Sequence, residues 1–177
     1  PASSRQEFTW DGAEMERAKR WGAFASELTT DLHEVLGHGS GRMADHITVT
    51  PQDLLKEQYS ALEEARADLV ARYFVADPYL VTIGLVAEDE QQPIVQTEYE
   101  AYARNALVQL RRVREGTQIE EDHMRNRQMI VRWLMANTTA IEVRTRDGKT
   151  FYVMTDPAAF CEGVGRLLAE VQRIKGE

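Results

Sequence analysis

The chain has 177 residues, of which 43% are hydrophobic and 28% charged, as is usual for one globular domain. Its net charge of -8 argues against non-specific binding to nucleic acid or to an anionic membrane. No apolar stretch approaches the ~18 residues of a membrane span. A single cysteine, Cys161, excludes an intrachain disulfide, so a cytoplasmic setting is expected unless an upstream signal was cleaved. Pro1 in place of Met suggests a piece of a longer protein.

A helix is predicted from about residue 13 to residue 38. Asp11 is a suitable N-cap just before it, and Gly39 is a suitable stop just after it. Apolar side chains recur at helical spacing, which favours a helix with one side in a core: Trp21, Phe24, Leu28 and Leu32.

The last turn of this helix contains His33-Glu34-Val35-Leu36-Gly37-His38. In the common zinc-peptidase motif His-Glu-x-x-His, the histidines lie at i and i+4, ~40° apart on a helix, and the glutamate is a general base. Here they lie at i and i+5, ~140° apart on an ideal helix. They can share one ion only if the helix is locally distorted, for example by a π-type bulge that Gly37 would take up. The alternative is a helix end with two unrelated histidines.

Residues 39–50 are predicted to be a linker with a short β-prone stretch at 47–49. His46 in this linker is more typical of a surface histidine than of a metal ligand. Thr50 and Pro51 then begin a helix to about residue 76. Its predicted buried side consists of Leu54, Leu55, Leu62, Leu69, Val70, Tyr73 and Phe74.

This second helix carries the segment Glu63-Glu64-Ala65-Arg66-Ala67-Asp68. Glu64 and Asp68, at i and i+4, share a face. If that face meets the histidines, Glu64 could bind a metal and Asp68 could accept the outer N–H of a ligating histidine. On these residues alone, the more common arrangement is a salt-bridged surface helix with Glu63 or Glu64 paired to Arg66.

Asp77 and Pro78 end this helix, and a short helical turn through 79–81 leads to Gly84. The acidic stretch 88–92 is predicted to be a solvated loop, followed by helices at about 93–115 and 118–137. Their core side chains are predicted to be Tyr99, Tyr102, Ala106, Leu110, Val113, Ile130, Trp133 and Leu134. His123 has charged neighbours in the first turn of the later helix, where most histidines are surface residues.

Residues 140–146 and 149–154 alternate as strands do and are separated by Asp147-Gly148, which together predict a β-hairpin. Asp156 and Pro157 begin a last helix to about residue 174, with Phe160, Val164, Leu167, Leu168 and Val171 as its apolar side. The predicted fold is mainly α, a single domain over residues 1–177 with one small β-hairpin at about 140–154.

The two motifs, in this order, resemble those of the dipeptidyl-peptidase III family of zinc peptidases. That family has an HEXXGH helix followed by a helix with E-E-x-R-A-[DE]. The similarity extends to Gly39-Ser40-Gly41 and to His123-Met124 with Arg127, and covers about residues 29–174.

The resemblance implies one Zn2+ bound by His33, His38 and Glu64, with Glu34 as the general base. These residue types suit that chemistry, because two imidazoles and a carboxylate leave an open position for water, whose pKa zinc lowers towards ~7. The resemblance further implies that His123 stabilises the reacting carbonyl. It places Glu63, Asp68 and Arg127 behind the ligands as supporting residues.

Members of this family are much longer, with a second lobe that forms the other wall of the substrate cleft. We therefore expect a helical catalytic lobe from a two-lobed peptidase that releases dipeptides from oligopeptide N-termini. The isolated chain, without its second lobe, should be weakly active or inactive. The alternatives are a zinc hydrolase with another substrate, and a non-catalytic interaction module whose structural zinc would need His46 or Cys161 as a fourth ligand.

Overall fold

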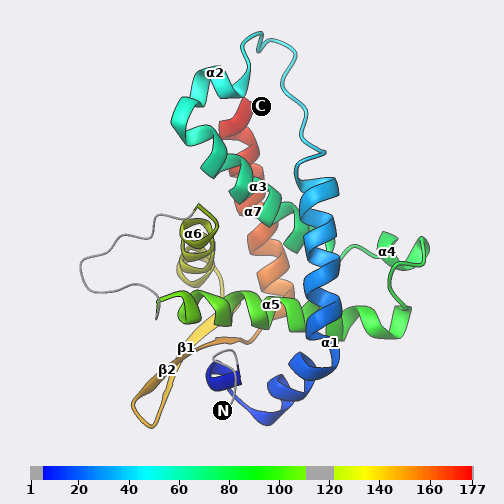
Figure 1. Ribbon diagram of the computed structural model, residues 1–177, viewed down its shortest axis with the longest axis vertical. Helices are drawn as coiled ribbons and strands as arrows, with labels where there is room; N and C mark the ends of the chain where they lie inside the picture. The colour runs from blue at the N-terminus through cyan, green and yellow to red at the C-terminus, as the bar shows by residue number, and fades with distance from the viewer. Residues whose placement is uncertain (1–5, 111–121, 177) are drawn as a thin grey trace.

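The computed structural model describes residues 6–110 and 122–176. Helices surround one main hydrophobic core, and a two-stranded antiparallel hairpin projects from one end (Figure 1). The prediction of a mainly α fold with one small β-hairpin is confirmed. Within the described ranges, no helix has the length and apolar character needed to span a bilayer.

The first helix changes its winding just before the predicted metal ligands. Helix α1 (Gly12–Asp31) begins as predicted, because the Asp11 side chain accepts a hydrogen bond from the Glu14 backbone N–H at 2.8 Å. Regular α-helix ends at Asp31, and Leu32–Gly37 form a π-helical turn. The His38 N–H donates to the His33 carbonyl at 3.1 Å, an i to i+5 bond. The predicted π-type distortion is confirmed.

The predicted second helix is interrupted. Helix α2 (Pro51–Leu55) is followed by a 3-10 turn, Lys56–Gln58, and then by α3 (Tyr59–Phe74). Lys56 has a φ of 49°, which breaks the helix. Neither α2 nor the turn contains a buried residue, so core packing does not hold them in line with α3. The predicted core positions Phe24, Leu54 and Tyr73 are exposed, and residues 47–49 form no strand.

Helix α4 (Tyr79–Thr82) leads to α5 (Glu88–Leu110), and the prediction of a loop at 88–92 is wrong. Three acidic residues occupy the first turn of α5, where carboxylates are stabilised by the positive end of the helix dipole. The Gln91 side chain also donates to the Asp77 carbonyl at 2.8 Å, which ties this turn to the end of α3. The predicted helix end near residue 115 and helix start near 118 fall outside the described residues.

The C-terminal part follows the sequence prediction closely. It consists of α6 (Asp122–Asn137), β1 (Ile141–Arg146), β2 (Lys149–Met154) and α7 (Pro157–Gly176). The hairpin pairs Ile141 with Met154 and Arg146 with Lys149, across a turn in which both residues have positive φ. Asp156 caps α7 by accepting the Ala159 N–H at 3.0 Å.

The packing of the helices brings the two sequence motifs together. Helix α5 crosses the lower part of α1, and α7 packs along α3 (Figure 1). The buried rings of Tyr99 on α5 and Phe160 on α7 stack with their centroids 4.1 Å apart. The π-helical turn at the end of α1 packs against α3, and α6 contacts α3 from another side. The glutamates of α3 therefore lie beside the two histidines.

Candidate metal centre

Gly37 sets the distance between the π-helical turn and α3. A Cβ atom on Gly37 would lie 2.8 Å from both Cα and Cβ of Ala67, closer than real Cβ contacts allow. Its φ is not in the left-handed region, so the glycine is required for close packing rather than for an unusual backbone conformation. Arg66, only 1% exposed, donates to the Gly37 carbonyl and satisfies a backbone acceptor at the end of the turn.

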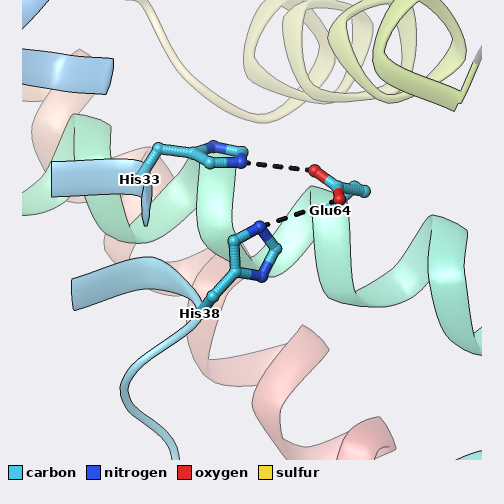
Figure 2. Close-up of side chains that lie close together, drawn as sticks. All are labelled: His33, His38 and Glu64. Atoms are coloured by element: carbon cyan, nitrogen blue, oxygen red, sulfur yellow. Dashed lines mark ion pairs between the residues drawn. The ribbon is translucent and has the colours of Figure 1, made fainter. Parts of the chain in front are cut away.

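His33, His38 and Glu64 form a compact cluster on this framework. Figure 2 shows the two imidazoles converging on the Glu64 carboxylate from opposite ends of the π-helical turn. His33 Nε2 lies 3.2 Å from Glu64 Oε2, and His38 Nε2 lies 3.7 Å from Glu64 Oε1. One ligand atom from each of the three residues lies within 4.8 Å of the others. The i, i+5 spacing thus brings both imidazoles to one point.

These separations suit a single small cation. With metal–ligand bonds of ~2.0–2.1 Å in a tetrahedral site, two ligand atoms are about 3.3 Å apart. The pair formed by His33 and Glu64 is already at that distance, and the pair formed by His38 and Glu64 is slightly wider. Two imidazoles and one carboxylate are also the donor set of catalytic zinc sites.

The Glu64 carboxylate carries an atom that protein hydrogen bonds leave unsatisfied. Glu64 Oε2 is buried and has no hydrogen-bond partner among the described residues, although His33 Nε2 is nearby. A proton on Nε2 would therefore not be aligned with Oε2. Since a buried acceptor without a partner costs about 1–3 kcal/mol, a cation between these two atoms would remove that cost.

Asp68 holds the outer nitrogen of His33. His33 Nδ1 lies 3.0 Å from Asp68 Oδ1, and both side chains are buried. This hydrogen bond raises the pKa of His33, although burial works in the opposite direction. Burial also opposes ionisation of Asp68, but the Arg72 guanidinium and His33 outweigh it and hold the pKa of Asp68 well below its ordinary value. Asp68 is therefore a permanent acceptor for the Nδ1 proton, which leaves Nε2 free for a metal.

Two further residues hold Asp68, and only one of them had a local signal in the sequence. Arg72 Nη1 donates to Asp68 Oδ1 at 3.0 Å, and its Nη2 lies 3.2 Å from Glu98 Oε1. The Tyr102 hydroxyl donates to Asp68 Oδ2 at 3.2 Å. Arg72 is at i+4 from Asp68 and could have been found by that spacing. Tyr102 is buried, as the sequence predicts, but its hydroxyl also serves as a hydrogen-bond donor to Asp68.

Glu63 contacts the outer nitrogen of His38, as Asp68 contacts that of His33. Its Oε1 lies 3.3 Å from His38 Nδ1, and Arg66 Nη2 donates to the same oxygen at 2.7 Å. Burial opposes ionisation of Glu63, but hydrogen bonds from Arg66 and Lys175 outweigh it and lower its pKa to about 2. The predicted alternative of a Glu63–Arg66 ion pair is therefore present. It is buried rather than on the surface, and it supports the cluster instead of replacing it.

The other predicted site residues lie at different distances from the cluster. His123, at the start of α6, has its Nδ1 3.6 Å from Glu64 Oε2 and its ring centroid 6.2 Å from that of His33. Glu34 is exposed on the π-helical turn and has no ion pair within the described part of the chain. Arg127 lies one turn beyond His123 and reaches the site only indirectly, with its guanidinium 5.4 Å from the Tyr102 ring centroid.

The residues considered as a fourth protein ligand lie elsewhere. His46 is exposed, and the Cys161 thiol lies 3.9 Å from the Tyr73 carbonyl beside the main core. Neither belongs to the cluster that the described residues form. A cavity of about 630 Å³ between α1 and α5 is lined by Thr29, Arg72 and Arg127, among others, and by none of the three cluster residues.

Substitution of Gly37 by alanine should separate the two halves of the site. The new methyl group would overlap the Ala67 backbone, so the π-helical turn must move away from α3. Overpacking of this kind costs about 1–3 kcal/mol, which thermal unfolding of the metal-free protein would measure. Zinc affinity should fall as well, because His33 and His38 move with the turn. Gly22→Ala on α1 is the matched control, since a Cβ there meets no atom within 4 Å. An unchanged unfolding midpoint for Gly37→Ala would contradict this account of the contact.

Comparisons with known proteins agree with this architecture. The model of peptidase family M49 matches residues 46–175. Among solved structures, DPP III from Caldithrix abyssi superposes with a TM-score of 0.69 at 20% sequence identity, covering 97% of this chain and 30% of that one. No curated protein sequence is similar enough to count as a match.

The family match covers only part of the site. The matched residues contain Glu63, Glu64, Asp68 and His123, while His33 and His38 lie just before them. The fold brings both parts to one cluster. The family model matches well over half of this chain, and the chain therefore belongs to peptidase family M49.

Proposed function

We propose that this chain is the zinc-binding catalytic lobe of a metallopeptidase that releases dipeptides from the N-termini of oligopeptides. The observation that carries the proposal is the cluster of His33, His38 and Glu64, which converges on one point with one buried carboxylate oxygen unsatisfied. Among the described residues the cluster has three members, and three protein ligands without a fourth are typical of catalytic rather than structural zinc sites. This donor count favours the peptidase over the alternative of an interaction module with structural zinc.

In this proposal, each residue of the site has a separate task. His33 and His38 would hold zinc through Nε2, and Glu64 would hold it through its carboxylate. When bound, zinc would polarise the peptide carbonyl and lower the pKa of the attacking water. Glu34, adjacent in sequence to His33 and without an ion-pair partner in the described residues, would accept the proton of that water on its carboxylate. His123 would donate a hydrogen bond to the carbonyl oxygen as negative charge develops there.

Substrate specificity is the part of the proposal that depends on residues outside this chain. The chain spans 30% of the length of the DPP III structure that it matches. We infer that a second lobe supplies the other wall of the cleft and holds the free N-terminus of the peptide. Without that lobe, hydrolysis by this chain should be slow or absent, because substrate positioning accounts for a large part of enzymatic rate enhancement.

Metal analysis tests the proposed site directly. Protein purified without chelators should contain about one zinc ion per chain, and dialysis against a strong chelator should remove it. Any hydrolysis of an oligopeptide, followed by mass spectrometry of the products, should release dipeptides and should cease after chelation. Protein that contains no zinc and takes up none from micromolar solution would contradict the site. Turnover as fast as that of a full-length relative would contradict the need for a second lobe, and products other than dipeptides would favour the alternative hydrolase.

A further inference from the structure

The last turn of α7 contacts Glu63, the partner of His38, although it is far from both residues in sequence. Lys175 Nζ is 2.6 Å from Glu63 Oε2, and the two side chains are only 11% and 12% exposed. Few surface ion pairs matter for stability, but a pair shielded from water is screened much less. The Lys175 ammonium is therefore held in direct contact with the Glu63 carboxylate, with little competition from water.

The Glu63 carboxylate connects Lys175 to a proposed metal ligand. Its Oε2 accepts from Lys175 and from Arg66 Nε, the latter at 3.1 Å. Its Oε1 lies 3.3 Å from His38 Nδ1. Arg66 also donates to Oε1 through Nη2 at 2.7 Å, so Arg66 and Lys175 together orient the carboxylate that faces the imidazole. His38 is exposed and lacks the enclosing core that surrounds His33, so it depends more on this support.

The same turn of α7 also holds the backbone that follows His38. The Ala44 N–H donates to the Gly176 carbonyl at 2.8 Å, and the Gln172 side chain donates to the Arg42 carbonyl at 3.3 Å. A Cβ on Gly41 would lie 3.0 Å from Gln172 Oε1, so this segment packs closely on α7. The end of α7 thus restrains His38 from two directions, through its side-chain partner and through the chain that leaves it.

From these contacts we propose that Lys175 is a positioning residue of the metal centre, which acts through Glu63 to orient His38. The inference rests on the proposed zinc site. It extends that site to a residue 137 positions away from His38 in sequence (175 minus 38). The imidazole of His33 provides an internal comparison, because it is oriented by Asp68 and Arg72, and among the described residues the ion pair of Lys175 is with Glu63 instead.

Zinc affinity of the intact chain, measured by competition with a chromophoric chelator, tests this proposal. Removal of residues that orient a metal ligand costs about 10- to 100-fold in metal affinity. Lys175 is one contact further out, so Lys175→Met should weaken zinc binding about tenfold. Lys175→Arg, which keeps the charge, should restore most of the affinity. Lys19→Met is the matched control, because it removes an exposed lysine paired with Glu16 on α1 and should leave zinc binding unchanged.

A double-mutant cycle separates positioning from a general loss of stability. Lys175→Met combined with Glu63→Gln should cost little more than Glu63→Gln alone, since both act on His38. Lys175→Met combined with Asp68→Asn should cost the sum of the two single effects, since Asp68 acts on His33. In the Co2+-substituted protein, Lys175→Met should also change the visible absorption spectrum, which reports the ligand geometry.

The outcomes distinguish this inference from the proposed function. Wild-type protein that binds no zinc would overturn the metal site itself. Zinc binding by the wild type with an unchanged affinity in Lys175→Met would overturn only the role of Lys175. Additive losses with Glu63→Gln would likewise overturn it, because they would mean that the two residues act independently. Lys175→Met could also lower the unfolding midpoint of the metal-free protein. In that case zinc affinity is compared between Lys175→Arg and Lys175→Gln. If Lys175 acts through its charge, only Lys175→Arg should keep the zinc affinity of the wild type.

Discussion

Replacement of Glu64 by glutamine should remove tight zinc binding. Glu64 is the one anionic member of the cluster, and its two oxygens face His33 and His38 separately. Zinc sites with four protein ligands have apparent binding free energies of about 10–16 kcal/mol, or roughly 3 kcal/mol per ligand. A loss of roughly 3 kcal/mol would weaken zinc binding by more than about 100-fold. Competition with a chelator of known affinity would measure it.

The same substitution should leave the metal-free fold intact. Glu64 Oε2 has no hydrogen-bond partner to lose in the described structure, and the side chain is partly exposed. Glu57→Gln, in the exposed turn just before α3, is the control and should bind zinc as the wild type does. Retention of wild-type zinc affinity by Glu64→Gln would exclude Glu64 as a ligand. It would also remove the main support for the proposed function.

Replacement of Glu34 by glutamine should have the opposite pattern, with zinc retained and hydrolysis lost. Glu34 lies on the π-helical turn beside His33 but is not part of the cluster. Glutamine has a similar shape and cannot accept a proton from water. Loss of a general base costs typically about 10²- to 10⁴-fold in rate. Because the chain is expected to be slow, single-turnover conditions with enzyme in excess over an oligopeptide are the appropriate measurement.

The control for Glu34→Gln is Glu27→Gln, an exposed glutamate on the preceding turns of α1. It should hydrolyse the peptide at the wild-type rate. Comparable zinc content in both variants would show that the loss is one of chemistry rather than of metal. If Glu34→Gln hydrolyses the peptide within about threefold of the wild type, Glu34 is not the general base, since even a modest one contributes ~10²-fold.

Several local features could be predicted from the sequence because they depend on neighbouring residues. The caps at Asp11, Thr50 and Asp156 and the turn at Asp147-Gly148 follow from side-chain and backbone preferences within four residues, and all are present. The π-helical distortion was predictable for a similar reason. Histidines at i and i+5 can share a metal only if the helix between them departs from regular winding, and it does so.

The boundaries that were predicted wrongly depend on packing. The break at Lys56 has no glycine or proline to mark it, and it occurs where α2 and the following turn bury no residue in the core. The charge of the stretch 88–92 by itself predicts a loop. In the fold this stretch forms the first turns of α5, where the dipole favours such charges and Gln91 anchors the turn to the end of α3.

By itself, the sequence identified the side chains that could bind a metal ion, and it determined that Glu64 and Asp68 share one helix face. Only the tertiary structure decided that this face meets the histidines, through the close contact of Gly37 with Ala67. It also decided that Lys175 reaches Glu63. Helical periodicity is local and can be seen in the order of residues. The approach of two helices depends on the volume of every side chain between them, and that sum is available only in the folded chain.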